Sequence, residues 1–208
     1  MGRAPVEPEY LAELTQRLGG ARAVFLIGSA ALGAYDPARS DLDVLAVVDA
    51  PLTAAERDGI VARCSHEALP CPARKLELVV YTAEQVATPS RDQRLELNLN
   101  TGAGSALVAE ATPAPGEWFW FVLDLAQARG HAVALHGPPP EELIGAVPRD
   151  LAIDALAECV AWYARHEPGE ALFAAAARTW RYAETGEWSS KTAALGWAIQ
   201  RSAAARSR

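Results

Sequence analysis

The first half of the chain alternates between helical and strand-like hydrophobic patterns. Residues 8–18 repeat leucine at helical spacing, and the Gly19-Gly20 pair that follows favours a helix end. A capping sequence from Thr53 to Glu56 predicts another helix, which runs to about residue 68. Short apolar runs bounded by glycine or polar residues predict buried strands. These strands are expected at residues 22–27, 42–48, 76–81 and 94–99.

The pattern changes after residues 102–116, which are rich in Gly, Ala and Pro. Beyond them apolar positions recur at helical spacing, and all six tryptophans lie in this part of the chain. Four helices are expected there, near residues 117–129, 149–165, 170–185 and 190–204. The expected fold class is therefore an α/β domain over residues 1–115, with a mixed sheet and flanking helices, followed by an all-α domain over residues 116–208.

The composition narrows the possible partners. Half of the 208 residues are hydrophobic and the formal net charge is −7, so the chain can form a packed core but has no excess of basic residues. This balance argues against a nucleic-acid binder, which needs Lys and Arg to offset phosphate charge. An acidic surface suits a cationic small molecule better. The oligomeric state, monomer or dimer, stays open.

The sequence also indicates where the protein is located and whether its cysteines form disulfides. No apolar run is long enough to span a membrane, and residues 1–10 are acidic and unlike a signal peptide. Three cysteines are too few for a disulfide scaffold, so we expect reduced thiols in a cytoplasmic protein. Cys64, His66 and Cys71 fit no closed four-ligand zinc site, and a helix end that packs a cysteine is the simpler interpretation.

Three carboxylates carry the candidate chemistry. Asp41 and Asp43 lie two residues apart, so a strand presents both on the same face. Two close carboxylates repel each other, and a hard divalent cation such as Mg²⁺ relieves that repulsion. Taken alone, the pair is more typical of a solvated strand end. Glu77, however, interrupts an apolar strand, and if the two strands are neighbours it joins the aspartates in a metal cluster that also supplies a general base. The alternative for Glu77 is a solvent-facing position on an edge strand.

A second motif suits phosphate binding. Gly28 directly follows a buried strand and lets a phosphate approach the backbone. The Ser29 hydroxyl and the N-terminus of the next helix, a short one expected to run through Tyr35, can donate hydrogen bonds to it. The glycines at 28 and 33 have the spacing of a P-loop, but the Lys-Ser/Thr that this motif requires is absent, which excludes it.

These motifs together resemble a known superfamily. Gly28-Ser29, eleven further residues and then Asp41-Leu42-Asp43-Val44 resemble the signature of polymerase-β-like nucleotidyltransferases, and Glu77 matches their third carboxylate. Residues 132–149 and the segment around Arg178 and Lys191 are similar to aminoglycoside adenylyltransferases of the streptomycin/spectinomycin type. The resemblance extends from about residue 24 to about residue 200.

The resemblance implies a role for each matched residue. The Mg²⁺ ligands would be Asp41, Asp43 and Glu77, with Glu77 also the base that deprotonates the acceptor hydroxyl. The phosphate contacts of the bound ATP would be Gly28, Ser29, Ser40, Arg178 and Lys191. Arg178 fits a solvated or ion-paired position on an amphipathic helix equally well, whereas the mobile point charge of Lys191 suits a triphosphate.

The sequence departs from the antibiotic-modifying members at the acceptor side. The tryptophan that relatives stack against the drug falls near Gly102 here, so a streptomycin-like ligand is expected to bind weakly. The acidic residue that relatives place before the arginine-bearing helix is matched only loosely, by Glu167 or Glu170. Together with Trp162, these glutamates are the candidate acceptor contacts.

Three functions follow from this pattern. The leading one is Mg²⁺-dependent transfer of AMP from ATP to a hydroxyl of a small molecule, such as an aminoglycoside-like cation. The second keeps the chemistry but uses a protein hydroxyl, as in toxin–antitoxin nucleotidyltransferases, although those minimal proteins usually lack a helical half. The third is a nucleotide-binding module without turnover, whose expected mark is the loss of a carboxylate.

Overall fold

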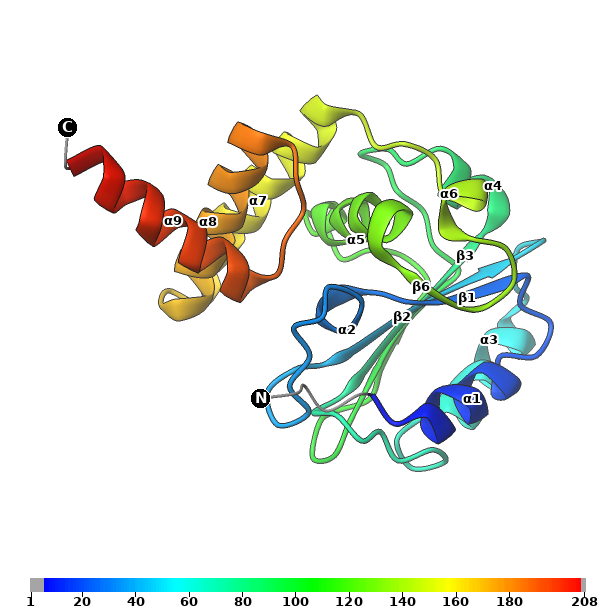
Figure 1. Ribbon diagram of the computed structural model, residues 1–208. Helices are drawn as coiled ribbons and strands as arrows, with labels where there is room; N and C mark the ends of the chain where they lie inside the picture. Colours follow the sequence, from blue (N-terminus) through cyan, green and yellow to red (C-terminus); the bar gives the residue numbers. More distant parts are fainter. Residues whose placement is uncertain (1–5, 207–208) are drawn as a thin grey trace.

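The sheet contains the strands that the apolar runs predict and two more. The computed structural model describes residues 6–206, and its six strands lie in the order β5-β4-β3-β2-β1-β6 (Figure 1). The central strands β2 and β3 are parallel, and every other neighbouring pair is antiparallel. The strands are β1 (Ala23–Leu26), β2 (Leu42–Val48), β3 (Leu76–Thr82), β4 (Leu97–Thr101), β5 (Val108–Glu110) and β6 (Val133–His136).

The two strands that the pattern did not predict are short edge strands. All three residues of β5 are exposed, and Val133 in β6 is 48% exposed, so neither strand needs the apolar run that marks a buried one. Strand β6 pairs with β1 and therefore adds a strand to the sheet from a part of the chain where only helices were expected.

Helices cover both faces of the sheet. On one face, α1 (Pro8–Arg17) and α3 (Ala54–Cys64) bury Leu14 and Ile60 against alternate residues of the central strands. On the other face, α5 (Trp118–His131) buries Phe121 and Leu125 against the intervening strand residues. Because successive strand side chains point to opposite faces, the parity of a position decides which helix layer it meets.

Two expected helices are shorter in the structure. The helix after Gly28 is α2 (Gly28–Ala31), which ends before Gly33 takes a φ of +63° instead of continuing to residue 35. Helix α3 stops at Cys64 rather than near residue 68, because Ser65 turns extended and its carbonyl accepts hydrogen bonds from the turn that follows. The remaining short helices are α4 (Ala83–Ala87) and α6 (Pro140–Leu143).

The helical half packs on the far side of α5. Helices α7 (Arg149–His166), α8 (Glu170–Thr185) and α9 (Lys191–Arg206) follow the expected segments. Phe119 and Leu123 of α5 share a buried cluster with α7 and α8, so α5 contacts the sheet with one side and these helices with the other (Figure 1). None of the helices within residues 6–206 is long and apolar enough to cross a membrane.

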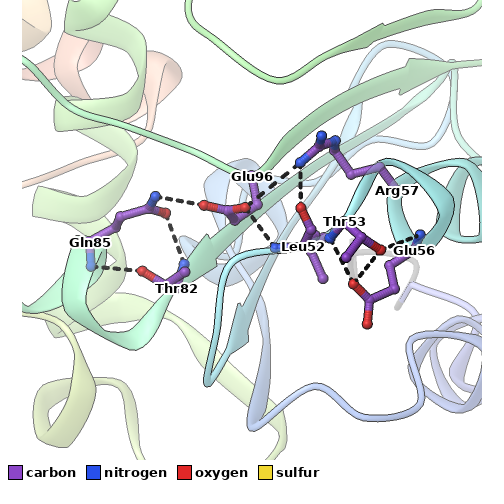
Figure 2. A network of polar contacts seen from close by, with 7 residues as sticks. All are labelled: Leu52, Thr53, Glu56, Arg57, Thr82, Gln85 and Glu96. Atoms are coloured by element: carbon purple, nitrogen blue, oxygen red, sulfur yellow. Dashed lines mark hydrogen bonds and ion pairs between the residues drawn. The ribbon is translucent and has the colours of Figure 1, made fainter.

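A network of polar contacts joins the segments that follow β2 and β3 to the residue before β4 (Figure 2). Glu96, 7% exposed, accepts hydrogen bonds at 2.8 Å from the Leu52 backbone N–H and from the Gln85 side chain. The predicted capping box of Thr53 and Glu56 lies beside it and is confirmed. Strand β4 begins at Leu97 and not at residue 94 as expected.

Candidate functional site

The parallel register brings two of the three carboxylates together. Asp43 of β2 lies directly opposite Glu77 of β3. Leu45 and Val79, two residues further along each strand, pack beneath α5, so Asp43 and Glu77 lie on the α5 side of the sheet as well. The condition on which the cluster depended, that the two strands are neighbours, is met.

Asp43 is held in an unfavourable environment for a charge. Burial raises the pKa of its carboxyl well above the usual range, and the neighbouring charges of Glu77, Asp124 and Asp41 raise it further. A carboxylate surrounded by like charges is stabilised by a bound cation or by protonation. The site therefore favours a positively charged ligand.

Asp41, which directly precedes β2, is turned towards a basic side chain instead. The Arg74 guanidinium donates two hydrogen bonds of 2.8 Å to it, from Nε to Oδ1 and from Nη2 to Oδ2. Lys75 Nζ lies 3.8 Å from Asp41 Oδ2 and also contacts the Glu77 carboxylate and, at 3.4 Å, Asn100 Oδ1. Neither basic residue was among the predicted site residues, although their position just before Glu77 is a usable signal.

The donor set suits a hard divalent cation only in part. Carboxylate oxygens are the ligands that Mg²⁺ prefers, and Asp43 and Glu77 present theirs together. Asp41 is engaged by Arg74, and within residues 6–206 no three His, Cys, Asp or Glu side chains are grouped to hold a metal ion. A three-carboxylate site therefore requires Asp41 to leave Arg74.

The glycine-serine motif lies directly against Asp43. Gly28 has a φ of +61°, and a Cβ there would lie 2.7 Å from Asp43 Cγ, so only glycine fits. The neighbouring Ser29 hydroxyl is buried and has no hydrogen-bond partner among the described residues. Ser40, by contrast, accepts a 3.0 Å hydrogen bond from the Asp36 N–H and so closes a turn.

A fourth carboxylate, Asp124 on α5, belongs to the same group. Its pKa is raised to about 7, first by burial and then by the charge of Glu77, while Arg178 lowers it. The sequence pattern predicted a helix here, and Asp124 was not among the predicted site residues. A single acid within the apolar stretch from Trp118 to Leu125 is the signal that marks it.

The two cations expected from the helical half lie on α8 and α9. The Arg178 Nε is buried and has no hydrogen-bond partner among residues 6–206, and its charge reaches Asp124. Lys191 Nζ donates a 3.2 Å hydrogen bond to Tyr163 Oη and lies 5.3 Å from the centre of that ring. Burial raises the pKa of the Cys159 thiol to about 11, while the charges of Arg178 and Lys191 both act to lower it, so the two cations lie in the same region.

The candidate acceptor contacts occupy the edge of the helical half. Glu170 forms a 3.8 Å ion pair with Arg39 of the loop before β2, and both side chains are largely exposed. The pKa of Arg74 is raised first by its hydrogen bonds to Asp41 and by the charge of Asp41, and Glu167 is near enough to add a smaller effect of the same sign. Trp162 donates a 3.1 Å hydrogen bond to Glu117, so its indole is already partnered. The two glutamates therefore face the sheet half, and Trp162 serves the packing of the helical half.

The part of the chain that contains β2 and β3 is similar to a known family. Residues 8–94 match the family model of the nucleotidyltransferase domain. This part of the chain therefore resembles a nucleotidyltransferase domain. The chain is accordingly an enzyme, as the sequence motifs predict. No curated protein sequence matches the chain.

Among solved structures the fold extends beyond the nucleotidyltransferase domain. The spectinomycin adenyltransferase AAD(9) from Enterococcus faecialis, solved with ATP and spectinomycin, matches with a TM-score of 0.65 at 20% sequence identity. The match covers 93% of this chain and 82% of that chain. The expected fold class and the resemblance to adenylyltransferases of this type are confirmed.

Asp124 predicts how stability changes with pH. Because its pKa in the folded protein is about 7, above the ordinary 3.8, its protonated form stabilises the fold below pH 3.8 and this stabilisation is lost as the pH rises through 7. Thermal unfolding should therefore show Asp124→Asn more stable than the native protein at pH 8 and no such gain at pH 4. Asp58→Asn, at an exposed position on α3, is the control. An equal effect of both changes at pH 8 would contradict the prediction.

Proposed function

We propose that the protein transfers AMP from Mg·ATP to a hydroxyl group of a small, cationic, polyhydroxylated acceptor. The observation that carries the proposal is the Asp43–Glu77 pair beside the unpartnered Ser29 hydroxyl. Paired carboxylates supply metal ligands and a base, and a buried hydroxyl without a partner supplies a phosphate contact.

The carboxylates would hold Mg²⁺ through Asp43 and Glu77, joined by Asp41 once it leaves Arg74. When bound, the ion neutralises phosphate charge and polarises the phosphoryl group. Gly28 keeps the backbone open for a phosphate, and Ser29 donates its hydroxyl to it.

The cations of the helical half would contact the triphosphate. Among residues 6–206 the Arg178 Nε has no hydrogen-bond partner to lose, and the contacts of the Lys191 ammonium are with the Tyr163 hydroxyl and ring. A guanidinium can bind phosphate oxygens bidentately, and a lysine ammonium offers a mobile point charge. Residues from both halves would therefore bind one nucleotide.

Glu77 is the residue best placed to act as base. It lies at the edge of the cluster with 37% of its side chain exposed, so an acceptor hydroxyl can approach it from solvent. Asp43 is less suited because Gly28 packs against its carboxylate. In our proposal Glu77 accepts the hydroxyl proton while the oxygen attacks the α-phosphorus, and the bond from that phosphorus to the α,β-bridging oxygen breaks to release pyrophosphate.

The charges around the site favour a cationic acceptor. Asp124, Glu167 and Glu170 add negative charge to the carboxylate cluster, and a positively charged ligand gains from such a field. An aromatic stacking residue at position 102 is excluded, because a Cβ at Gly102 would lie 2.5 Å from the Arg74 carbonyl oxygen. The acceptor would therefore be held by charge and hydrogen bonds, and streptomycin should be a poor substrate.

The test is transfer of label from ATP. The full chain is incubated with Mg²⁺ and ATP labelled at the α- or the γ-phosphorus, and with spectinomycin, streptomycin, simpler polyols or a mixed protein acceptor. We expect α-label on a small cationic polyol and release of γ-label as pyrophosphate, with Asp43→Asn as the inactive control. Label on protein alone would support the toxin-like alternative, and ATP binding without transfer in any panel would support a binding module.

A further inference from the structure

Two basic residues at the start of β3 are built into the carboxylate cluster. Arg74 binds Asp41 through two hydrogen bonds of 2.8 Å, and Lys75 contacts Glu77 and approaches Asp41 at 3.8 Å. Lys75 is one of only two lysines in the sequence, the other being Lys191. Both lysines are thus found among the charged residues of the candidate site.

The two cations carry the charge of one divalent ion. Arg74 and Lys75 together supply two positive charges, and they use the same oxygens of Asp41 and Glu77 that a metal ion needs. A carboxylate oxygen held by a guanidinium or an ammonium has less capacity for a metal, and the cations repel an incoming one.

The backbone that carries these cations is fixed. The Arg74 N–H donates a 3.4 Å hydrogen bond to the Ser40 carbonyl, and Gly102 packs so closely on residues 74 and 75 that a side chain at position 102 has no room. The Arg74 side chain, in contrast, is 62% exposed. The cations can therefore move away from the carboxylates only by rotation of their own side chains.

We propose that Arg74 and Lys75 are resident counter-ions that a divalent cation must displace from Asp41 and Glu77. This inference rests on the proposed function, since it assumes that the carboxylates take a metal. Displaced cations are most stable beside an anion, so free Mg²⁺ binds weakly and Mg·ATP, which brings phosphates with the metal, binds in preference. Arg74 and Lys75 are positioning residues that couple the metal to the nucleotide.

The first test measures metal binding without nucleotide. Mn²⁺ is titrated at pH 8 into the native protein, Lys75→Gln and Arg74→Gln, with free Mn²⁺ followed by electron paramagnetic resonance. Removing one like charge about 4 Å from the metal should raise the Mn²⁺ affinity of each variant by on the order of tenfold. Lys75→Arg keeps the charge and should retain the native affinity. Arg22→Gln removes a surface cation paired with Asp49 at 3.2 Å and should change nothing.

The second test follows the displacement in the native protein. Labelling with ¹³Cε-lysine gives two side-chain signals, and the spectrum of Lys75→Arg identifies the signal of Lys75. Mg²⁺ alone, at saturation, should shift the Lys75 signal and leave that of Lys191 in place. The displacement itself is measured on the native protein, and the Lys75→Arg variant serves only to assign the signal.

The outcomes separate this inference from the proposed function. The inference is overturned if folded Lys75→Gln and Arg74→Gln bind Mn²⁺ no more tightly than the native protein. It is also overturned if the Lys75 signal does not shift at saturating Mg²⁺. Both conclusions hold even if the native protein transfers AMP. Raised Mn²⁺ affinity together with a shifted Lys75 signal supports the inference even if no AMP transfer is found, in which case only the proposed function fails.

Discussion

Replacement of Glu77 by glutamine is expected to reduce AMP transfer by on the order of a hundred- to ten-thousand-fold. Glutamine keeps the shape of the side chain and its place opposite Asp43, but it cannot accept the proton of the acceptor hydroxyl. ATP binding should change far less than turnover, because the phosphate contacts proposed for Ser29, Arg178 and Lys191 are left intact. Single-turnover transfer of α-label, with ATP affinity measured in parallel, separates the two effects.

The control for this variant is Glu84→Gln, the same change at an exposed position on α4. Its transfer rate should match that of the native protein. If Glu77→Gln lowers ATP binding and turnover in equal proportion, Glu77 acts only as a metal ligand and not also as the base. A rate within a few-fold of the native one would show that another group takes the proton.

The central part of the fold could be predicted because its signals are local. The apolar runs of β2 and β3 are buried on both faces, so they appear in the sequence as continuous hydrophobic segments. Glu77 is the single acid in β3, and its presence in an apolar strand is explained only if a neighbouring strand places another polar group beside it. The parallel pairing of Asp43 with Glu77 provides that explanation.

What could not be predicted depends on contacts between distant segments. Strand β6 has no buried apolar run, and its pairing with β1 follows from the return of α5 across the sheet. The ion pair of Arg74 with Asp41 depends on the register of β2 and β3, which no local pattern specifies. Asp124 reaches the cluster only because α5 packs on the same face as Glu77.

The position of α5 also explains why the helical half matters for the proposed chemistry. One side of α5 covers the sheet next to the carboxylates, and the other side packs against α7 and α8, which carry Cys159 and Arg178. A rigid element shared by two cores fixes the distance between the groups that it joins. The charge of Arg178 is thereby held within reach of Asp124.

Replacement of Asp43 by asparagine is expected to separate activity from stability. Asparagine has nearly the same shape, so it fits beside Gly28, but it removes the charge that would bind the metal. Metal-based charge stabilisation is worth several kcal/mol, so transfer should fall by on the order of a thousandfold or more. The amide also ends the repulsion with Glu77, Asp124 and Asp41, which raises the pKa of Asp43 in the native protein.

The folded protein should therefore be at least as stable after this change, and more stable at high pH. The protonated Asp43 carboxyl stabilises the fold below its unfolded-state pKa, and this contribution disappears as the pH rises through the higher pKa of the folded state. Thermal unfolding at pH 5 and pH 9, together with α-label transfer, tests both halves of the prediction. An inactive variant that is also less stable at pH 9 would mean that Asp43 supports the structure, and an active variant would show that its charge is not needed for transfer.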